Sequence, residues 1–251
     1  MVLARVDEGL AQPDAVEIAT AGDAPALDPG RAAALSTRPV VAKTALDKAR
    51  EAPGSTKARI LEAAEAIFAE RGFAGASTRE IAARAGVNIS SLHYHWASKE
   101  ALYVAVFRNV FDHIVEVLRG VLAGSDLDHA DRRALIDQVM AILFDHFADH
   151  PNVPKLLMRR VLERDDIDFG LQRDVLGPAW AVFDQWLGRL GPPREETESR
   201  LFMLSVQSVL LVYLLDSQAY GSLLGGSVRE APLRERVRAH VSRLVHALLA
   251  A

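Results

Sequence analysis

Residues 77–96 read STREIAARAGVNISSLHYHW, and this stretch decides how the rest of the chain is interpreted. Ser77 and the glutamate three residues later have the spacing of a capping box, in which each side chain binds a free backbone N–H group at a helix start. The helix that begins there is short, because Gly86 supplies the positive φ of a tight turn. Asn88 or Ser90 can cap a third helix after this turn. Two short helices joined in this way form a helix-turn-helix.

Helices on both sides complete this unit. Apolar residues at Ile60, Ala64 and Phe68 follow the spacing of one helical face, and that helix ends at Gly72. Ser98 can cap a fourth helix, whose apolar stripe is long enough to run into a second domain: Leu102, Val106, Val110, Ile114, Val117 and Val121. The third helix, at about residues 89–96, then projects so that its N-terminal end can enter a DNA major groove.

The remaining sequence predicts further helices and no strands. Helices are expected at about residues 131–148, 154–163, 171–190, 194–219 and 231–249, with Gly177-Pro178 able to break or kink the third of these. The fold class is therefore all-α, with a three-helix helix-turn-helix domain at 53–100 and a larger helical domain at 101–251. Residues 1–52 are rich in Ala, Pro and Asp, which favours a mostly disordered tail with at most a short helix at 40–50.

Composition excludes several classes of protein. The chain of 251 residues has no cysteine, which excludes disulfides and thiolate chemistry. Its longest apolar run, Val209–Leu215, is too short to span a membrane, and no export signal is visible, so we expect a soluble cytoplasmic protein. The net charge is −4, but residues 53–99 carry six basic and four acidic residues, a local excess that favours a phosphate-facing surface.

Thr56–Leu102 resembles the DNA-binding domain of the tetracycline-repressor (TetR) family of bacterial regulators. The similar motifs fit in register without a gap: Ile60-Leu61-Glu62-Ala63-Ala64, Phe68-Ala69-Glu70-Arg71-Gly72-Phe73, Ser77-Thr78-Arg79-Glu80-Ile81-Ala82, Ala85-Gly86-Val87, Leu92-His93-Tyr94-His95-Trp96 and Ser98-Lys99-Glu100-Ala101-Leu102. The resemblance implies a homodimeric repressor that binds a palindromic operator in double-stranded DNA and is released by a small-molecule inducer.

The resemblance also implies which residues contact DNA. Phosphate contacts are expected from Thr78, Arg79 and Lys99, base contacts from Asn88, Ile89, Ser90 and Ser91, and base or phosphate contacts from His93 and Tyr94. The family usually has Tyr at position 93, so His93 makes a shorter and pH-sensitive contact. Leu92 and Trp96 are expected to lie in the core of the domain.

In the TetR family the last two long helices of each subunit form a four-helix bundle with those of the partner. The corresponding helices here are residues 194–219, with Leu201, Leu204, Ser208, Leu211 and Leu215, and residues 231–249, with Leu233, Val237, Val241, Leu244 and Leu248. Another apolar face on the same helices can be core instead. Dimerisation also follows from function, because one small helix-turn-helix reads too few base pairs.

Bulky residues of the second domain are candidates for an inducer pocket: Phe147, Met158, Trp180, Phe183, Trp186, Phe202, Met203 and Tyr213. Gln207 and Arg159 lie among apolar residues and can orient a ligand. The alternatives are core packing for the aromatic residues and solvent exposure for the two polar ones. An inducer that fits one of two conformations better would shift the population away from DNA.

A different hypothesis is a metal-dependent enzyme built on Asp145, His146, Asp149 and His150. The two histidines are one helical turn apart, and a third ligand would have to come from elsewhere, such as His113 or His129. Histidines near a helix C-terminus are common without a metal, which is the interpretation we favour. The chain has no nucleophile elbow, phosphate loop or paired-carboxylate motif, so we expect neither an enzyme nor a cofactor. A transcriptional activator remains open.

Overall fold

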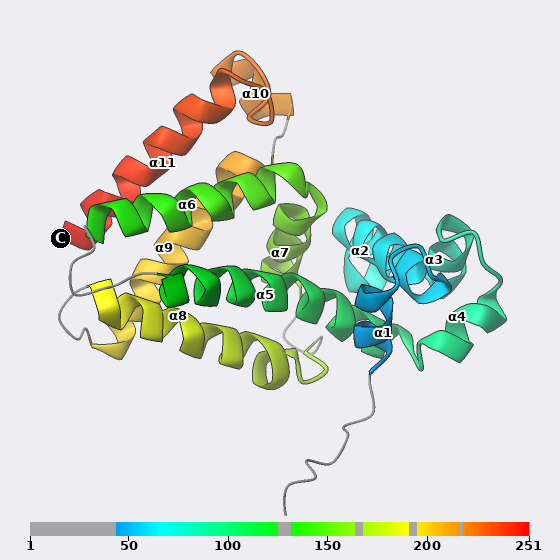
Figure 1. Ribbon diagram of the computed structural model, residues 1–251. Coiled ribbons are helices and arrows are strands. Elements are labelled where there is room, and N and C mark those ends of the chain that lie inside the picture. The colour runs from blue at the N-terminus through cyan, green and yellow to red at the C-terminus, as the bar shows by residue number, and fades with distance from the viewer. Residues whose placement is uncertain (1–43, 125–131, 164–167, 191–194, 216–217, 251) are drawn as a thin grey trace, which may run out of the picture. The chain divides into compact units, whose positions relative to one another are not determined.

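The computed structural model describes residues 44–124, 132–163, 168–190, 195–215 and 218–250, and within these ranges every regular element is a helix (Figure 1). The expected all-α fold class is confirmed. The helices are α1 (Ala45–Glu51), α2 (Thr56–Gly75), α3 (Thr78–Arg84), α4 (Ile89–His95), α5 (Lys99–Gly124), α6 (Arg132–Asp149), α7 (Asn152–Leu162), a π-helical turn η2 (Gln172–Leu176), α8 (Gly177–Leu190), α9 (Glu196–Leu214), α10 (Gln218–Leu224) and α11 (Leu233–Ala250).

The helix boundaries near the N-terminus follow the local signals of the sequence. The regular part of α2 stops at Gly72, where φ is 69° and ψ is 179°. The capping box at the start of α3 is present, with the Ser77 hydroxyl accepting the Glu80 N–H at 3.2 Å. Ser98 caps α5 by accepting the Ala101 N–H at 3.1 Å, and Asn88 rather than Ser90 caps α4. These expectations are confirmed. Caps can be predicted from sequence because they depend on neighbours only three residues apart.

Two of the later predictions need correction. The segment expected as one helix at 171–190 begins as the π-helical turn η2 and continues as α8 from Gly177, where a side chain would lie 3.1 Å from the Gln172 carbonyl oxygen. The segment expected as one helix at 194–219 is divided, since α9 ends at Leu214 and α10 begins at Gln218. Neither Gly nor Pro marks this second break, so the sequence contains no breaker signal for it.

The expected tail also ends earlier than residue 52. Residues 45–51 form α1, whose Leu46 and Ala49 are buried and which packs against α2. Arg50 fixes α1 to α5, because its guanidinium donates to Asn109 Oδ1 at 2.8 Å and to Asp112 Oδ2 at 3.0 Å. The short helix allowed for at residues 40–50 is therefore present over residues 45–51. The rest of that prediction, residues 1–43, lies outside the described residues.

Helices α2, α3 and α4 pack around a common core that includes the N-terminal part of α5 (Figure 1). Ile60, Phe68, Ile81, Leu92 and Leu102 are fully buried there. Helix α5 has 26 residues, a length of about 39 Å at 1.5 Å per residue, and its later part packs against α6 and α8. Helix α7 packs against α2, and α11 packs against α6. None of the described helices is both long enough and apolar enough to cross a membrane.

Candidate DNA-binding surface and effector pocket

The turn between α3 and α4 has a defined hydrogen-bond pattern. The Val87 N–H donates to the Ala82 carbonyl at 3.0 Å, and the Gly86 N–H donates to the Ala83 carbonyl at 3.1 Å. This is a Schellman motif, which requires a residue of positive φ at the position of Gly86, where φ is 65°. Asn88 then starts α4 by accepting the Ser91 N–H at 2.7 Å. The turn therefore sets the direction of α4, which we call the recognition helix after its position in the helix-turn-helix.

The recognition helix has one buried face and one exposed face. Leu92 is fully buried and Trp96 nearly so, which confirms that both belong to the core. Tyr94 is 86% exposed, and Ser90 and His93 are also exposed. A large aromatic side chain held so far into solvent by an anchored helix is available for contact with another molecule.

Two cationic side chains near α4 differ in how far other residues already bind them. Arg79, at the start of α3, is exposed and has no ion-pair partner among the described residues. The Lys99 ammonium donates to the carbonyl oxygens of Phe73 and Ala76, both at 2.9 Å, and lies 4.2 Å from the centre of the Phe73 ring. Lys99 therefore holds the α2–α3 connection together and has one N–H group left for a further acceptor.

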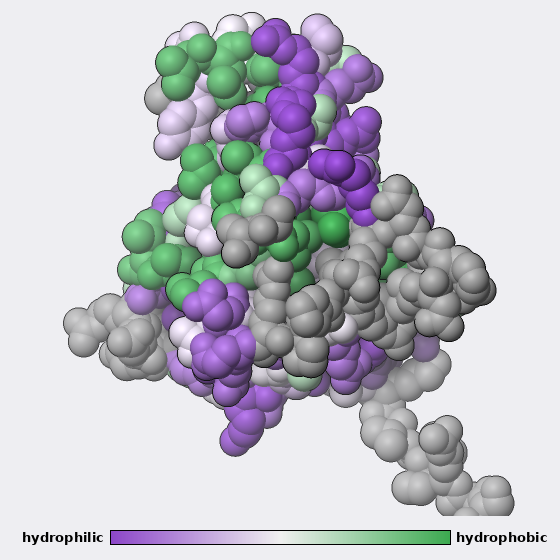
Figure 2. Space-filling view, turned by 90° about the vertical axis from the view of Figure 1, so that its left-hand side faces the viewer, coloured by the Kyte–Doolittle hydropathy of each residue, from purple (hydrophilic) through white to green (hydrophobic). Residues whose placement is uncertain are grey.

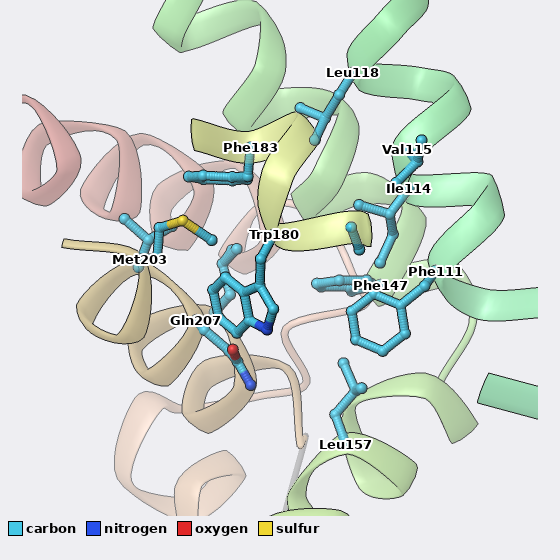
Figure 3. Close-up of a pocket in the computed structure, with 13 residues that line it drawn as sticks. Phe111, Ile114, Val115, Leu118, Phe147, Leu157, Trp180, Phe183, Met203 and Gln207 are labelled. Carbon is cyan, nitrogen blue, oxygen red and sulfur yellow. The ribbon is translucent and has the colours of Figure 1, made fainter. Parts of the chain in front are cut away.

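A separate apolar cavity of about 100 Å³ lies between α5, α6, α7, α8 and α9 (Figure 3). We call this cavity the effector pocket, after the role proposed for it; it is lined by Phe111, Ile114, Val115, Leu118, Phe147, Leu157, Ala179, Trp180, Phe183, Met203, Val206, Gln207 and Leu210. The Trp180 ring lies between Met203 and Gln207 on one side and the rings of Phe111 and Phe147 on the other. The Gln207 amide is the group in this lining that can both donate and accept hydrogen bonds.

Comparison with known proteins assigns the chain to a family. Residues 60–106 match the family described as bacterial regulatory proteins, tetR family. The HTH-type transcriptional regulator Mb3439c of Mycobacterium bovis is 34% identical over 167 residues, which cover 63% of this chain and 84% of that protein. The chain belongs to the tetR family. Its resemblance to that family in residues 56–102 is confirmed.

Two further proteins extend the comparison. The HTH-type transcriptional repressor NicS of Pseudomonas putida is 29% identical over 102 residues, which cover 41% of this chain and 46% of NicS. The match therefore spans about half the length of that repressor. The crystal structure of the transcriptional regulator FadR from Bacillus subtilis in complex with stearoyl-CoA covers 76% of this chain and 97% of FadR, with a TM-score of 0.55 and 15% identity. This likeness shows that the tetR-family chain shares the FadR fold.

The structure of this tetR-family chain brings together half of the residues expected in the pocket. Phe147, Trp180, Phe183, Met203 and Gln207 line it. The other five lie elsewhere: Met158 packs against the core, Arg159 donates to the Glu70 carbonyl, Trp186 and Phe202 are buried in the core, and Tyr213 contacts His240. The lining from α5 was not predicted, although the apolar stripe of that helix was recognised, because periodicity does not show which buried side chains border a cavity.

The four residues of the hypothetical metal enzyme are divided between two faces of α6. Asp145 and Asp149 face α11, where Arg234 binds them at 2.9 and 2.7 Å. The His146 ring instead lies 4.4 Å from the His113 ring, in a polar cavity of about 330 Å³ that Glu65 and Glu116 also line. In the part of the chain that the structure describes, no three His, Asp or Glu side chains are arranged to hold a metal ion. His129 lies outside that part.

His146 of α6 has an unusual electrostatic environment. Burial, together with neighbouring His150 and His113, lowers the pKa of His146 to about 4. Burial also raises the pKa of the Glu65 carboxyl group, which approaches this cluster from α2. His146 is therefore uncharged at neutral pH, as its packing between two other imidazole rings requires.

The two long C-terminal helices of the tetR-family chain, α9 and α11, differ in how much of their apolar surface is exposed to solvent. On α9, Leu201 and Leu204 are each 52% exposed, and Ser208 and Val212 continue the same face. Leu211, expected on this face, is buried within the chain. On α11, the expected interface residues Val237 and Val241 are also buried, because α11 packs against α6. Figure 2, which views the molecule from the left-hand side of Figure 1, shows apolar side chains gathered beside charged ones on that side.

Proposed function

We propose that this tetR-family chain is a homodimeric transcriptional repressor that binds a palindromic operator in double-stranded DNA and is released when a small, largely apolar inducer occupies the effector pocket. The observation that carries the proposal is the recognition helix α4, whose Ser90, His93 and Tyr94 are exposed while Leu92 and Trp96 anchor it. Such a helix on a rigid turn fits a major groove. The protein would act in the cytoplasm, where bacterial DNA is accessible.

The contacts proposed with DNA divide into two kinds. Thr78 and Arg79 lie in the first turn of α3, where backbone N–H groups and a cationic side chain favour phosphate oxygens. Lys99 contributes its remaining N–H group to the same backbone. The residues proposed to read base edges are those at the start of α4: Asn88, Ile89, Ser90 and Ser91, with His93 and Tyr94 one turn further on. Ile89 is half-buried, so its contribution is limited to apolar contact, for example with a thymine methyl group.

The α9 face defined by Leu201, Leu204, Ser208 and Val212 is the proposed centre of the dimer interface. Two adjacent leucines, each half exposed, form an apolar patch of the kind that marks a protein contact. Leu248 of α11, which is 37% exposed, extends it. A two-fold axis through this surface would present two recognition helices to the two halves of a palindrome.

The lining of the effector pocket supports one class of inducer. Its lining is aromatic and aliphatic with one amide, so the buried part of the inducer is an apolar ring or chain with a single polar group for Gln207. A cavity of about 100 Å³ is smaller than the roughly 300–1,000 Å³ typical of ligand pockets, so a larger inducer must push the surrounding helices apart. This requirement links occupancy of the pocket to a movement of the surrounding helices.

The test is selection of operator sequences from a random duplex library with the full chain. A two-fold symmetric consensus is expected, and gel shifts with it should be specific. Ser90→Ala should then change which sequence is preferred, whereas Arg79→Ala should weaken all sequences alike. Failure to enrich any sequence would contradict the proposal. A reporter gene under the selected operator decides between repression and activation.

A further inference from the structure

We infer that Glu163, at the end of α7, is a positioning residue through which the effector pocket controls the DNA-binding helices. The inference rests on the proposed function and names the residues that regulate the same site. Glu163 binds the segment that follows the break in α2, residues 72–76, which we call the α2–α3 connection, and Arg159 binds the backbone just before the break. We call this pair of side chains the α7 latch.

The latch acts where α2 breaks. At Gly72 the backbone leaves the helix, so the Phe73 N–H has no helical acceptor. Glu163 Oε1 replaces that acceptor at 2.5 Å, and Arg159 Nη2 donates to the Glu70 carbonyl at 2.5 Å on the other side of the break. Two side chains of α7 thus bind backbone groups on both sides of Gly72. A side chain at position 72 would lie 2.9 Å from the same carboxylate oxygen, so the α2 backbone at Gly72 is in direct contact with Glu163.

The latch also reaches α5. The Tyr103 hydroxyl donates to the second oxygen of Glu163, and the Tyr103 side chain is 1% exposed. Burial and the Glu163 carboxylate raise the pKa of Tyr103, so the phenol remains a hydrogen-bond donor throughout the range in which the protein functions. Lys99, one helical turn before Tyr103, binds the carbonyl groups of Phe73 and Ala76. The 72–76 connection is therefore held between α7 and α5 and leads directly to Ser77, the cap of α3.

The other end of this linkage is the effector pocket. Leu157 of α7 lines the pocket, while Leu156 next to it is fully buried against the core. Leu157 and Glu163 are six residues apart, about 9 Å along a helix. A helix this short moves as one body, so an inducer that pushes Leu157 outward also moves Glu163.

The energies favour movement of the connection together with α7. If Glu163 left while residues 72–76 stayed in place, the Phe73 N–H and the Tyr103 hydroxyl would both lose their acceptor. Hydrogen bonds to a charged group are about twice as strong as those between neutral groups, and a buried donor without a partner is costly. The connection therefore follows Glu163, and the start of α3, with Thr78 and Arg79, follows the connection.

The test uses a filled pocket, so that it does not depend on the identity of the inducer. Ala179→Phe places a ring in the effector pocket from α8, and Ala181→Phe is the matched control, because Ala181 is on the same helix but exposed. Each change is made in the native chain and in Glu163→Ala. The affinity for the selected operator is measured by fluorescence anisotropy, and thermal melting confirms that every variant is folded.

In the native background we expect Ala179→Phe to weaken operator binding by about 5–150-fold, the usual range of allosteric coupling, and Ala181→Phe to leave it unchanged. In Glu163→Ala the effect of Ala179→Phe should largely disappear. Glu163→Gln, which keeps an acceptor for the Phe73 N–H, should restore part of it. Tyr103→Phe removes only the hydroxyl group and should reduce the effect in the same direction, which provides a second test if Glu163→Ala is unstable.

The outcomes separate the latch from the function on which it rests. A purely structural role of Glu163 would lower operator affinity by the same factor with a filled or an unfilled pocket, and an unchanged ratio would overturn the inference while leaving the repressor intact. An Ala179→Phe protein that binds the operator as the native chain does would overturn the proposed induction itself, and the latch with it. Absence of operator binding in the native chain would contradict the proposed function directly.

Discussion

Gly72 and Gly86 are two of the glycines with positive φ in the DNA-binding unit, and alanine should affect stability differently at the two positions. Gly86 has φ of 65°, and a Cβ atom there would meet only Arg59 Nη1 at an ordinary 3.7 Å. Gly72 has φ of 69° with ψ of 179°, and its Cβ would meet Glu163 Oε1 at 2.9 Å. The first substitution therefore strains only the backbone, whereas the second also displaces a bound carboxylate.

The magnitudes follow from these contacts. A left-handed conformation costs a non-glycine residue about 1–2 kcal/mol, so Gly86→Ala should lower the unfolding free energy by this amount. The backbone region of Gly72 is essentially restricted to glycine and costs other residues about 1–3 kcal/mol. Displacing Glu163 weakens at least one hydrogen bond to a charged group, which adds about 1.5–3 kcal/mol. Gly72→Ala should therefore cost about 2.5–6 kcal/mol, more than the upper end of the range for Gly86→Ala.

Thermal melting at one protein concentration measures the difference. For a chain of this size, each kcal/mol shifts Tm by about 2–4 °C, so Gly86→Ala should lower Tm by about 2–8 °C and Gly72→Ala by clearly more. Gly120→Ala is the control, because Gly120 is exposed inside α5 with no neighbour within 4 Å, and alanine should raise stability there by about 0.5–1 kcal/mol. Equal losses for Gly72→Ala and Gly86→Ala would refute the contact with Glu163.

Other parts of the structure lead to three more predictions. Arg79→Ala should weaken binding to all DNA sequences equally. It should also reduce the slope of log affinity against log salt concentration by about 0.9 for each phosphate group that the arginine neutralises in the native complex. An unchanged slope in a salt titration would exclude a phosphate contact. Leu204→Glu should convert the dimer to a monomer in light scattering and reduce operator affinity, whereas Leu223→Glu, at an exposed site of α10, should remain dimeric. Burial holds the pKa of His146 at about 4, below its unfolded value near 6.5, so stability should fall as the pH drops through that interval. Melting between about pH 7 and pH 5 should therefore show a smaller loss in His146→Gln than in the exposed-site control His93→Gln, and equal losses would contradict the assigned environment.

Local sequence signals were enough to predict the DNA-binding unit. The capping box at Ser77, the turn at Gly86 and the cap at Ser98 are all present as expected. Each depends on hydrogen bonds between residues at most five positions apart, so the residue types themselves specify the geometry. The core positions Leu92 and Trp96 were predicted for the same reason, because helical periodicity shows which face of a short helix is buried.

Tertiary packing alone decided which partner each buried face has. Periodicity marked Val237 and Val241 as apolar positions of α11, but only the packing of α11 on α6 shows that they belong to the core of the chain. Asp145 and Asp149 are near histidines in the sequence, yet Arg234, 85 residues or more away, binds them. The contact between Glu163 and the Phe73 N–H joins residues 90 positions apart. No local pattern encodes such contacts, because they arise only when separate helices pack together.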